Sequence, residues 1–266
     1  MIKITLPNFF YYHNVNINLI NLQKDYPEYF HENICFYEQE GNFPFHYWAG
    51  EKNYNQKTVA YKDYIYYLNN ATIPLCLDCS NPLLNDKDFL DSAMNVMLDT
   101  LQNGSNKIII SSIETLNCLK AKYPYYLYIG SEFYLASDPE LQSLNELYKV
   151  KIYHQNLPNY PHIPKNKIQV IINNPCDNCP TVECLLNEWQ NIYNFKRESY
   201  FLNCQKIDIT DSSINWELIE KLSEQGYTNF GFNSRGFYLT DINFIKRLYI
   251  KLFVRPQYQD KVFNLL

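Results

Sequence analysis

Several features that would direct the chain to particular functions are scarce or missing. No apolar run approaches the roughly 18 residues needed to cross a bilayer, so a membrane-spanning role is not expected. Glycine occurs only 7 times and the 13 prolines are spread along the chain, so no linker divides it into domains. There is no phosphate loop, G-x-G-x-x-G, H-E-x-x-H or G-x-S-x-G sequence. These absences argue against nucleotide-binding loops, zinc proteases of the H-E-x-x-H type and nucleophile-elbow hydrolases.

The charge balance is mildly acidic. Lysine and arginine total 23 against 28 aspartates and glutamates, which gives a formal net charge of −5. General attraction to phosphate backbones is therefore not favoured, and an RNA substrate would need a local basic patch. The opening residues MIKITLPNFFYY hold one lysine and no long apolar core, so they do not form a signal peptide. A cytoplasmic location is the expectation.

The order of secondary structure predicts the fold. Short β-rich runs alternate with longer helical patterns, as in parallel α/β proteins, and 266 residues is close to the roughly 250 typical of an eight-stranded barrel. We predict a single (β/α)8 TIM-type barrel over residues 1–266. The strands are expected at Ile2–Leu6, Asn33–Glu38, Ile73–Cys79, Lys107–Ser111, Tyr126–Ile129, Val150–His154, Lys167–Asn173 and Thr228–Asn233.

Helices are expected between these strands, and some of their ends carry recognisable signals. Asn85 is the predicted N-cap of its helix, and Gly226 lies where a helix would stop. Residues 156–166 form a proline-rich loop without a helical pattern, so the barrel should be slightly irregular around strand six. The helices are expected at Asn16–Asp25, Gln56–Asn69, Asn85–Asn103, Ile113–Lys122, Asp138–Tyr148, Ile214–Gly226 and Thr240–Val254.

Four cysteines directly after the seventh strand are the strongest chemical signal. Cys176, Cys179 and Cys184 have the spacing C-x2-C-x4-C, and Cys204 follows across a longer loop. Two thiolates separated by two residues can bind one ion from a single turn. We therefore predict a cysteine-rich, metal-binding insertion at residues 174–206. Structural thiols and disulfides are the alternatives, and a reducing compartment disfavours the disulfides.

Four thiolates suit two kinds of centre. A zinc ion held by four cysteines has no coordination position left for water and would be structural. An iron–sulfur cluster would permit redox chemistry, and spacing alone does not choose between the two. The other cysteines have simpler roles: Cys35, Cys76 and Cys118 are expected to fill apolar space, and strand alternation should direct Cys76 and Cys79 to opposite faces.

Polar residues at the carboxyl ends of the predicted strands should gather at one face of the barrel, where such folds build active sites. Glu132 and Arg235 are the predicted substrate contacts, one as acid or base and the other as an anion clamp, with a rim salt bridge as the alternative. His46 lies in an aromatic loop that could close over a ligand, and His154 ends strand six. The remaining candidates at this face are Glu38, Glu40, Asp78, Asn81, Ser111, Ser112 and Glu114.

Three stretches, in this order, resemble the collagenase-like peptidase family of unknown catalytic type, number thirty-two, which includes RNA- and ubiquinone-hydroxylation proteins. The first runs from Lys107 through Leu116–Tyr123 to Ser131, and the second is Ile168–Asn173 leading into Cys176. The third is Leu218–Arg235, similar to the family's "L-x-x-x-G-x-x-S-F-K-I-E-G-R" segment. The resemblance covers about half of the chain.

The resemblance implies an α/β barrel in which cysteines hold an iron–sulfur cluster. Cys176, Cys184 and Cys204 match the family's first three cysteines, whereas Cys179 has no clear counterpart. This chain also departs from the family in reading Gly231-Phe-Asn-Ser-Arg235 where the family has K-I-E-G-R, so only the arginine is kept.

The leading functional hypothesis is therefore an iron–sulfur barrel that modifies a small molecule or RNA by redox or oxygen-independent hydroxylation chemistry. The alternative is a catalytically inactive barrel, stabilised by a structural zinc ion on the four cysteines, that binds a ligand or a partner protein. Metal-dependent proteolysis depends only on the family's name. Some relatives work as pairs, so a homodimer or heterodimer is conceivable.

Overall fold

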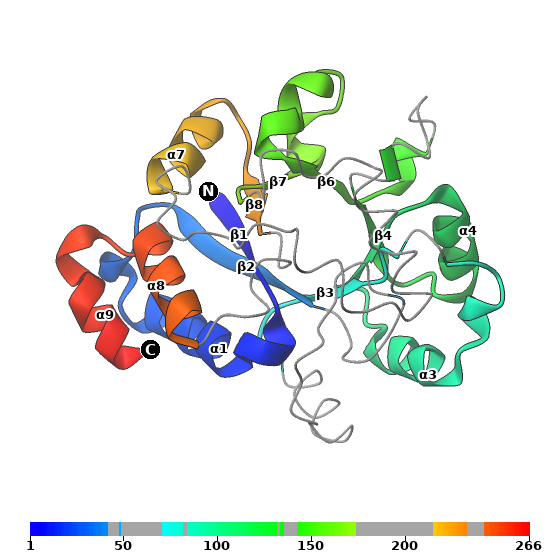
Figure 1. The fold of residues 1–266 in the computed structure, drawn as a ribbon, viewed down its shortest axis with the longest axis horizontal. Coiled ribbons are helices and arrows are strands. Elements are labelled where there is room, and N and C mark those ends of the chain that lie inside the picture. Colours follow the sequence, from blue (N-terminus) through cyan, green and yellow to red (C-terminus); the bar gives the residue numbers. More distant parts are fainter. Residues whose placement is uncertain are drawn as a thin grey trace, which may run out of the picture.

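The protein is a closed barrel of eight parallel strands. A computed structural model describes residues 1–41, 48, 71–81, 84–131, 134–135, 143–173, 215–232 and 242–266. Each strand pairs with the next along the chain, and β8 pairs with β1 to close the barrel (Figure 1). The predicted TIM-type fold is confirmed. The strands are β1 (Ile2–Leu6), β2 (Ile34–Gly41), β3 (Leu75–Asp78), β4 (Lys107–Ile110), β5 (Leu127–Gly130), β6 (Lys149–Tyr153), β7 (Ile168–Ile171) and β8 (Asn229–Gly231).

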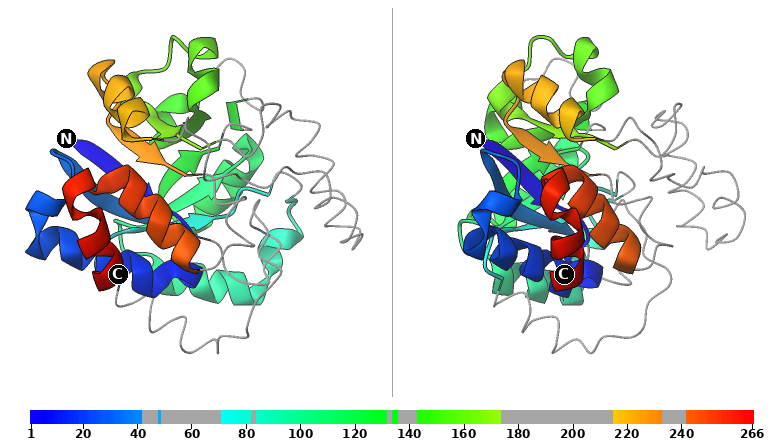
Figure 2. Two further views of the ribbon diagram at one scale, coloured as in Figure 1. Left: turned by 60° about the vertical axis from the view of Figure 1, so that its left-hand side comes forward. Right: turned by 90° about the vertical axis from the view of Figure 1, so that its left-hand side faces the viewer.

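Helices surround this barrel. The described α-helices are α1 (Phe9–Asp25), α3 (Ser92–Leu101), α4 (Ile113–Lys122), α7 (Trp216–Glu224), α8 (Ile242–Phe253) and α9 (Gln259–Leu265). Helices α1, α8 and α9 lie together on one side, and α3 and α4 lie on the other (Figures 1 and 2). In the described part of the chain, none of them combines the length and apolarity that crossing a bilayer would require.

The predicted strands agree with the observed ones to within a few residues, and the helices agree less evenly. Helix α4 has the expected bounds, and α7 ends at Glu224 shortly before Gly226, whose φ of 98° is in the left-handed region. After β6 the chain forms a 3-10 helix at His154–Asn159, which is the irregularity expected there. The expected helix at Gln56–Asn69 lies outside the described residues.

Three helix predictions need correction. Helix α1 begins at Phe9 rather than Asn16. Helix α3 begins at Ser92, because the side chain of Asp91 accepts a hydrogen bond from the Met94 amide and caps the helix there. The predicted cap Asn85 instead accepts a bond from the Lys87 amide in a preceding turn. Of the helix expected at Asp138–Tyr148, the described part, 143–148, contains only the short 3-10 helix Leu144–Glu146.

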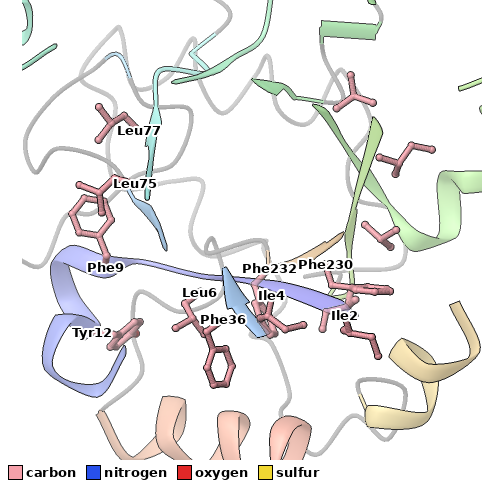
Figure 3. Close-up of a cluster of buried hydrophobic side chains, with 14 of the residues drawn as sticks. Ile2, Ile4, Leu6, Phe9, Tyr12, Phe36, Leu75, Leu77, Phe230 and Phe232 are labelled. Atoms are coloured by element: carbon pink, nitrogen blue, oxygen red, sulfur yellow. The ribbon is translucent and has the colours of Figure 1, made fainter. Parts of the chain in front are cut away.

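The apolar core lies mainly outside the barrel wall, between strands and helices. Outward side chains of β1, β2, β3 and β8 meet the helices in one continuous cluster. A second, small cluster consists of Cys76, Ile109 and Ile129, with Tyr148 packed against it. The wall is therefore sealed by apolar packing on its outer face, while polar groups occupy much of the interior. Figure 3 labels part of the outer cluster: Ile2, Ile4, Leu6, Phe9, Tyr12, Phe36, Leu75, Leu77, Phe230 and Phe232.

We predict that Phe253 is a large contributor to this outer core. Its fully buried ring lies 5.3 Å from the Phe36 ring and 6.0 Å from the Phe232 ring, so it joins α8 to β2 and β8. Phe253→Ala should lower the free energy of unfolding by about 3–5 kcal/mol in urea titrations. Leu265→Ala, at a side chain that is 48% exposed, should change it by less than about 0.5 kcal/mol. Equal losses in both variants would contradict this assignment.

Candidate active site in the barrel interior

Near the N-terminal ends of β4 and β6, the barrel interior contains a carboxylate between two ammonium groups. Glu38 on β2 is fully buried, and its Oε1 lies 3.2 Å from Nζ of Lys107 on β4 and 3.3 Å from Nζ of Lys149 on β6. The Cys76 thiol donates to the other carboxylate oxygen at 3.2 Å. These three charged residues come from alternate strands, as side chains of one interior layer do in such barrels. We call Glu38, Lys107 and Lys149 the lysine–glutamate layer.

Burial and charge together shift the pKa values of Glu38, Lys149 and the neighbouring Cys76. Burial alone would raise the pKa of Glu38, but Lys149 and Lys107 overcome it and hold the value below the ordinary 4.5. Burial lowers the pKa of Lys149, and the Glu38 carboxylate only partly opposes this effect. Burial and the same carboxylate raise the pKa of Cys76 well above its ordinary value, so this thiol stays protonated and can donate.

Two tyrosines extend this arrangement. Nζ of Lys149 lies 4.9 Å from the Tyr148 ring centroid and 5.2 Å from that of Tyr37, and Lys107 contacts both rings at similar distances. The two phenol oxygens are 3.3 Å apart. Such contacts stabilise a cation over an aromatic face. The charged groups of the lysine–glutamate layer and the two tyrosine rings therefore contact one another, which indicates a structural role for this layer.

A second charged pair lies nearer the C-terminal ends of the strands. Oε1 of Glu40 on β2 is 2.5 Å from Nζ of Lys151 on β6, and both side chains are largely buried. Burial raises the pKa of Glu40 above its usual value. Lys151 opposes this rise, while the Asp78 and Glu38 carboxylates add to it. Glu40 therefore differs from Glu38, two residues away, in the direction of its pKa shift.

Polar groups without partners among the described residues lie on the strands to either side of Lys151. Within the described residues, Oγ of Ser111, Oγ of Ser131 and both amide atoms of Gln169 are buried and have no hydrogen-bond partner. Gln169 pairs in register with Lys151, and the Ser131 amide extends the β4–β5 ladder by donating to the Ile110 carbonyl. Strand alternation directs these side chains inward. We call this set the C-terminal mouth: Glu40, Asp78, Ser111, Ser131, Lys151 and Gln169.

This arrangement contains some of the residues predicted from the sequence. Asp78 and Ser111 belong to the C-terminal mouth as expected. Glu38 and Glu40 lie within β2 rather than after it. Ser112 instead caps α4 by accepting from the Thr115 amide, and Glu114 is an exposed residue of the first turn of that helix.

Other predicted residues lie beside or outside the site. His154 is half-buried at the start of a 3-10 helix, where burial lowers its pKa. Asn81 is buried, and its backbone N–H donates to the Trp48 carbonyl. Cys76 and Cys79 belong to separate clusters, as strand alternation indicated. The main predicted site residues lie outside the described residues: Glu132, Arg235, His46, Cys176, Cys179, Cys184 and Cys204.

Sequence inspection missed the groups that complete the interior. Lys107, Lys149, Lys151 and Gln169 lie within strands that otherwise read as apolar, and this interruption is the signal that could have identified them. Among the described residues, no group of three or more histidine, cysteine, aspartate or glutamate side chains is arranged to hold a metal ion. The four described cysteines, Cys35, Cys76, Cys79 and Cys118, are free thiols.

No protein-family model, curated protein or solved structure matches the chain. The resemblance to the collagenase-like peptidase family stays a prediction, and so does the iron–sulfur or zinc centre drawn from it. The interior geometry is therefore the basis for the functional proposal.

We predict that Glu38→Gln strongly destabilises the fold. The substitution leaves the Lys107 and Lys149 ammonium groups without their buried counter-charge, which should cost about 3–5 kcal/mol in urea unfolding at pH 7. Because the pKa of Glu38 is lowered in the folded chain, its contribution is present above the ordinary 4.5 and is lost as pH falls through the lowered value. The difference in free energy of unfolding between the wild type and Glu38→Gln should therefore become smaller in acid.

A matched control is Glu146→Gln, which removes an exposed ion pair with Lys120 at 2.8 Å. This change should cost less than about 1 kcal/mol. If Glu38→Gln were as mild as the control, the lysine–glutamate layer would not be the interior constraint described above.

Proposed function

We propose that the C-terminal mouth is an active site for proton transfer at a carbon next to a carbonyl group. The observation that carries this proposal is the 2.5 Å contact between Glu40 and Lys151, buried at the end of the barrel where active sites of this fold are built. Glu40 acts as the base on the carbon, and Lys151 binds the carbonyl oxygen. The unpaired serine and glutamine groups bind the rest of the substrate.

The electrostatics of the pair suit this division of roles. A general base works best when its pKa lies near the working pH, and burial moves Glu40 in that direction. Removing a proton from carbon places negative charge on the carbonyl oxygen. A fixed ammonium group in a dry site stabilises such an oxyanion far better than water does. Lys151 supplies that charge without needing to reorganise.

The four-cysteine segment supports a second, separate proposal. The described chain leads toward it as far as Asn173, two residues after β7 ends, at the end of the barrel that holds the mouth. Four thiolates would suit an iron–sulfur cluster or a zinc ion. A cluster would add electron transfer to the site, whereas a zinc ion held by all four thiolates would stabilise the fold.

The first prediction concerns Glu40. Wild-type protein in D2O should catalyse deuterium incorporation beside the carbonyl of at least one compound in a panel of acetone, pyruvate, hydroxyacetone and dihydroxyacetone, followed by proton NMR. Glu40→Gln should lower this rate at least about 100-fold, because it removes the base. The rate should rise with pH through the raised pKa of Glu40, since only the carboxylate accepts the proton.

Glu146→Gln is the control for this experiment, because it removes an exposed carboxylate on the outside of the barrel. Its exchange rate should equal that of the wild type. Thermal melts of both variants show whether each is folded. No exchange with any compound, or an unchanged rate in folded Glu40→Gln, would show that the Glu40–Lys151 pair is only structural.

The second prediction concerns the cysteines. Protein purified without oxygen should contain one metal centre per chain, which Cys179→Ser and Cys204→Ser each diminish and Cys118→Ser leaves intact. Iron with sulfide and a broad visible absorption band would indicate a cluster, and one zinc in colourless protein would indicate the structural site. Metal-free wild-type protein would contradict both forms of this proposal.

A further inference from the structure

Gln169 has a buried amide group that makes no hydrogen bond to any residue that the structure describes. Its side chain is 1% exposed, and neither Oε1 nor Nε2 has a partner in the described part of the chain. Burying such a group without partners costs free energy, so its place in an interior strand needs a compensating role. On β7 it pairs in register with Lys151 on β6, and the inward faces of the two residues are neighbours. Gln169 is thus the neighbour of Lys151 on the inner face of the barrel wall.

Gly231 makes room for this amide. It lies on β8, paired with Ile171, and a Cβ atom built on it would collide with Nε2 of Gln169 and lie 3.3 Å from its Cδ. Any other residue at position 231 would force the glutamine side chain to move. The missing side chain and the unpaired amide are therefore two parts of one arrangement.

The polar groups of the mouth follow one row across neighbouring strands. Ser131 comes one residue after β5, where its amide continues the ladder with β4, and Ser111 comes one residue after β4. Lys151 and Gln169 continue the row on β6 and β7. With strands about 4.8 Å apart, the four positions span about 14 Å. That length fits a small molecule with several oxygen atoms.

We infer that the mouth takes a small hydroxycarbonyl compound, such as a hydroxyketone or short sugar, whose adjacent carbonyl and hydroxyl groups pair with the amide of Gln169. A carboxamide offers one donor and one acceptor side by side, and a carbonyl next to a hydroxyl is its complement. The hydroxyls of Ser111 and Ser131 bind further oxygen atoms along the row. This inference rests on the proposed proton-transfer function, and it names the substrate class of that site.

The reaction that follows is an isomerisation. The Glu40 carboxylate takes the proton from the carbon that carries the hydroxyl, the released electron pair forms a carbon–carbon double bond, and the carbonyl oxygen becomes negative beside Lys151. The proton then returns to the former carbonyl carbon. The hydroxyl oxygen loses its proton and becomes the new carbonyl, while the former carbonyl oxygen gains one. Substrate and product are isomers, so no oxidant or reductant is consumed.

The test compares two substrates that differ in their hydroxyl groups. Deuterium exchange of dihydroxyacetone and of acetone is measured in D2O, and the ratio of their kcat/KM values is compared between proteins. Gln169→Leu should lower the wild-type ratio by about 5- to 150-fold, because the hydrogen bond from the substrate hydroxyl to the buried amide is lost and acetone has no hydroxyl to make it. Gly231→Ala should lower it in the same direction by displacing the amide. Dihydroxyacetone should also yield glyceraldehyde with the wild type.

Gln102→Leu is the matched control. Gln102 accepts a bond from the exposed Tyr125 amide at the end of α3, away from the mouth, so the ratio should not change. If exchange depends on Glu40 but the ratio is the same in Gln169→Leu and Gly231→Ala as in the wild type, the substrate inference fails while the proposed function stands.

If no compound exchanges, the proposed function fails, and saturation-transfer NMR of dihydroxyacetone then decides the binding question. Binding to the wild type that is lost in Gln169→Leu would support the hydroxycarbonyl site alone. Equal binding in both proteins, or none in either, would overturn it.

Discussion

A buried carboxylate held between two lysines is the constraint on which the barrel interior depends. Glu38 has its two ammonium partners at 3.2 and 3.3 Å, on strands β4 and β6, and it also accepts from the Cys76 thiol. Charges taken out of water in this way are tolerated only when each finds a partner with good geometry. The layer therefore fixes the relative positions of β2, β3, β4 and β6, while apolar packing against the helices seals the outer wall.

Strands β2 and β6 also carry the Glu40–Lys151 pair, nearer their C-terminal ends and among different charges. Glu38 faces two cations, so its pKa falls. Glu40 is buried beside a single cation, so burial, together with smaller effects of the Asp78 and Glu38 carboxylates, raises its pKa. The charges of the lysine–glutamate layer pair with one another, whereas Ser111, Ser131 and Gln169 in the C-terminal mouth have no hydrogen-bond partner among the described residues. This contrast separates a layer that stabilises the barrel from a mouth that is suited to bind and act on a substrate.

The sequence predicts much of the fold, because β-branched runs and helix caps are local signals. Helix α4 follows from its sequence pattern, and α7 ends shortly before Gly226 as expected. Helix α3 begins at Ser92, because Asp91 rather than Asn85 caps it. The interior charges are less visible. Glu38 and Lys149 are 111 residues apart, and only barrel closure brings them together. Gln169 looks like a chance polar residue in an apolar strand, and only the fold shows that its amide lies against Gly231 on β8.

The most direct test of this account is the titration of the two glutamates of β2. Carbon-13 NMR of protein labelled at the glutamate carboxyl carbons, with Glu38→Gln and Glu40→Gln for assignment, measures each pKa in the folded chain. The account predicts that Glu38 titrates below 4.5 and Glu40 above it, although they are two residues apart on one strand. A Glu40 carboxyl that titrates at or below 4.5 would contradict the claim that the mouth holds a general base.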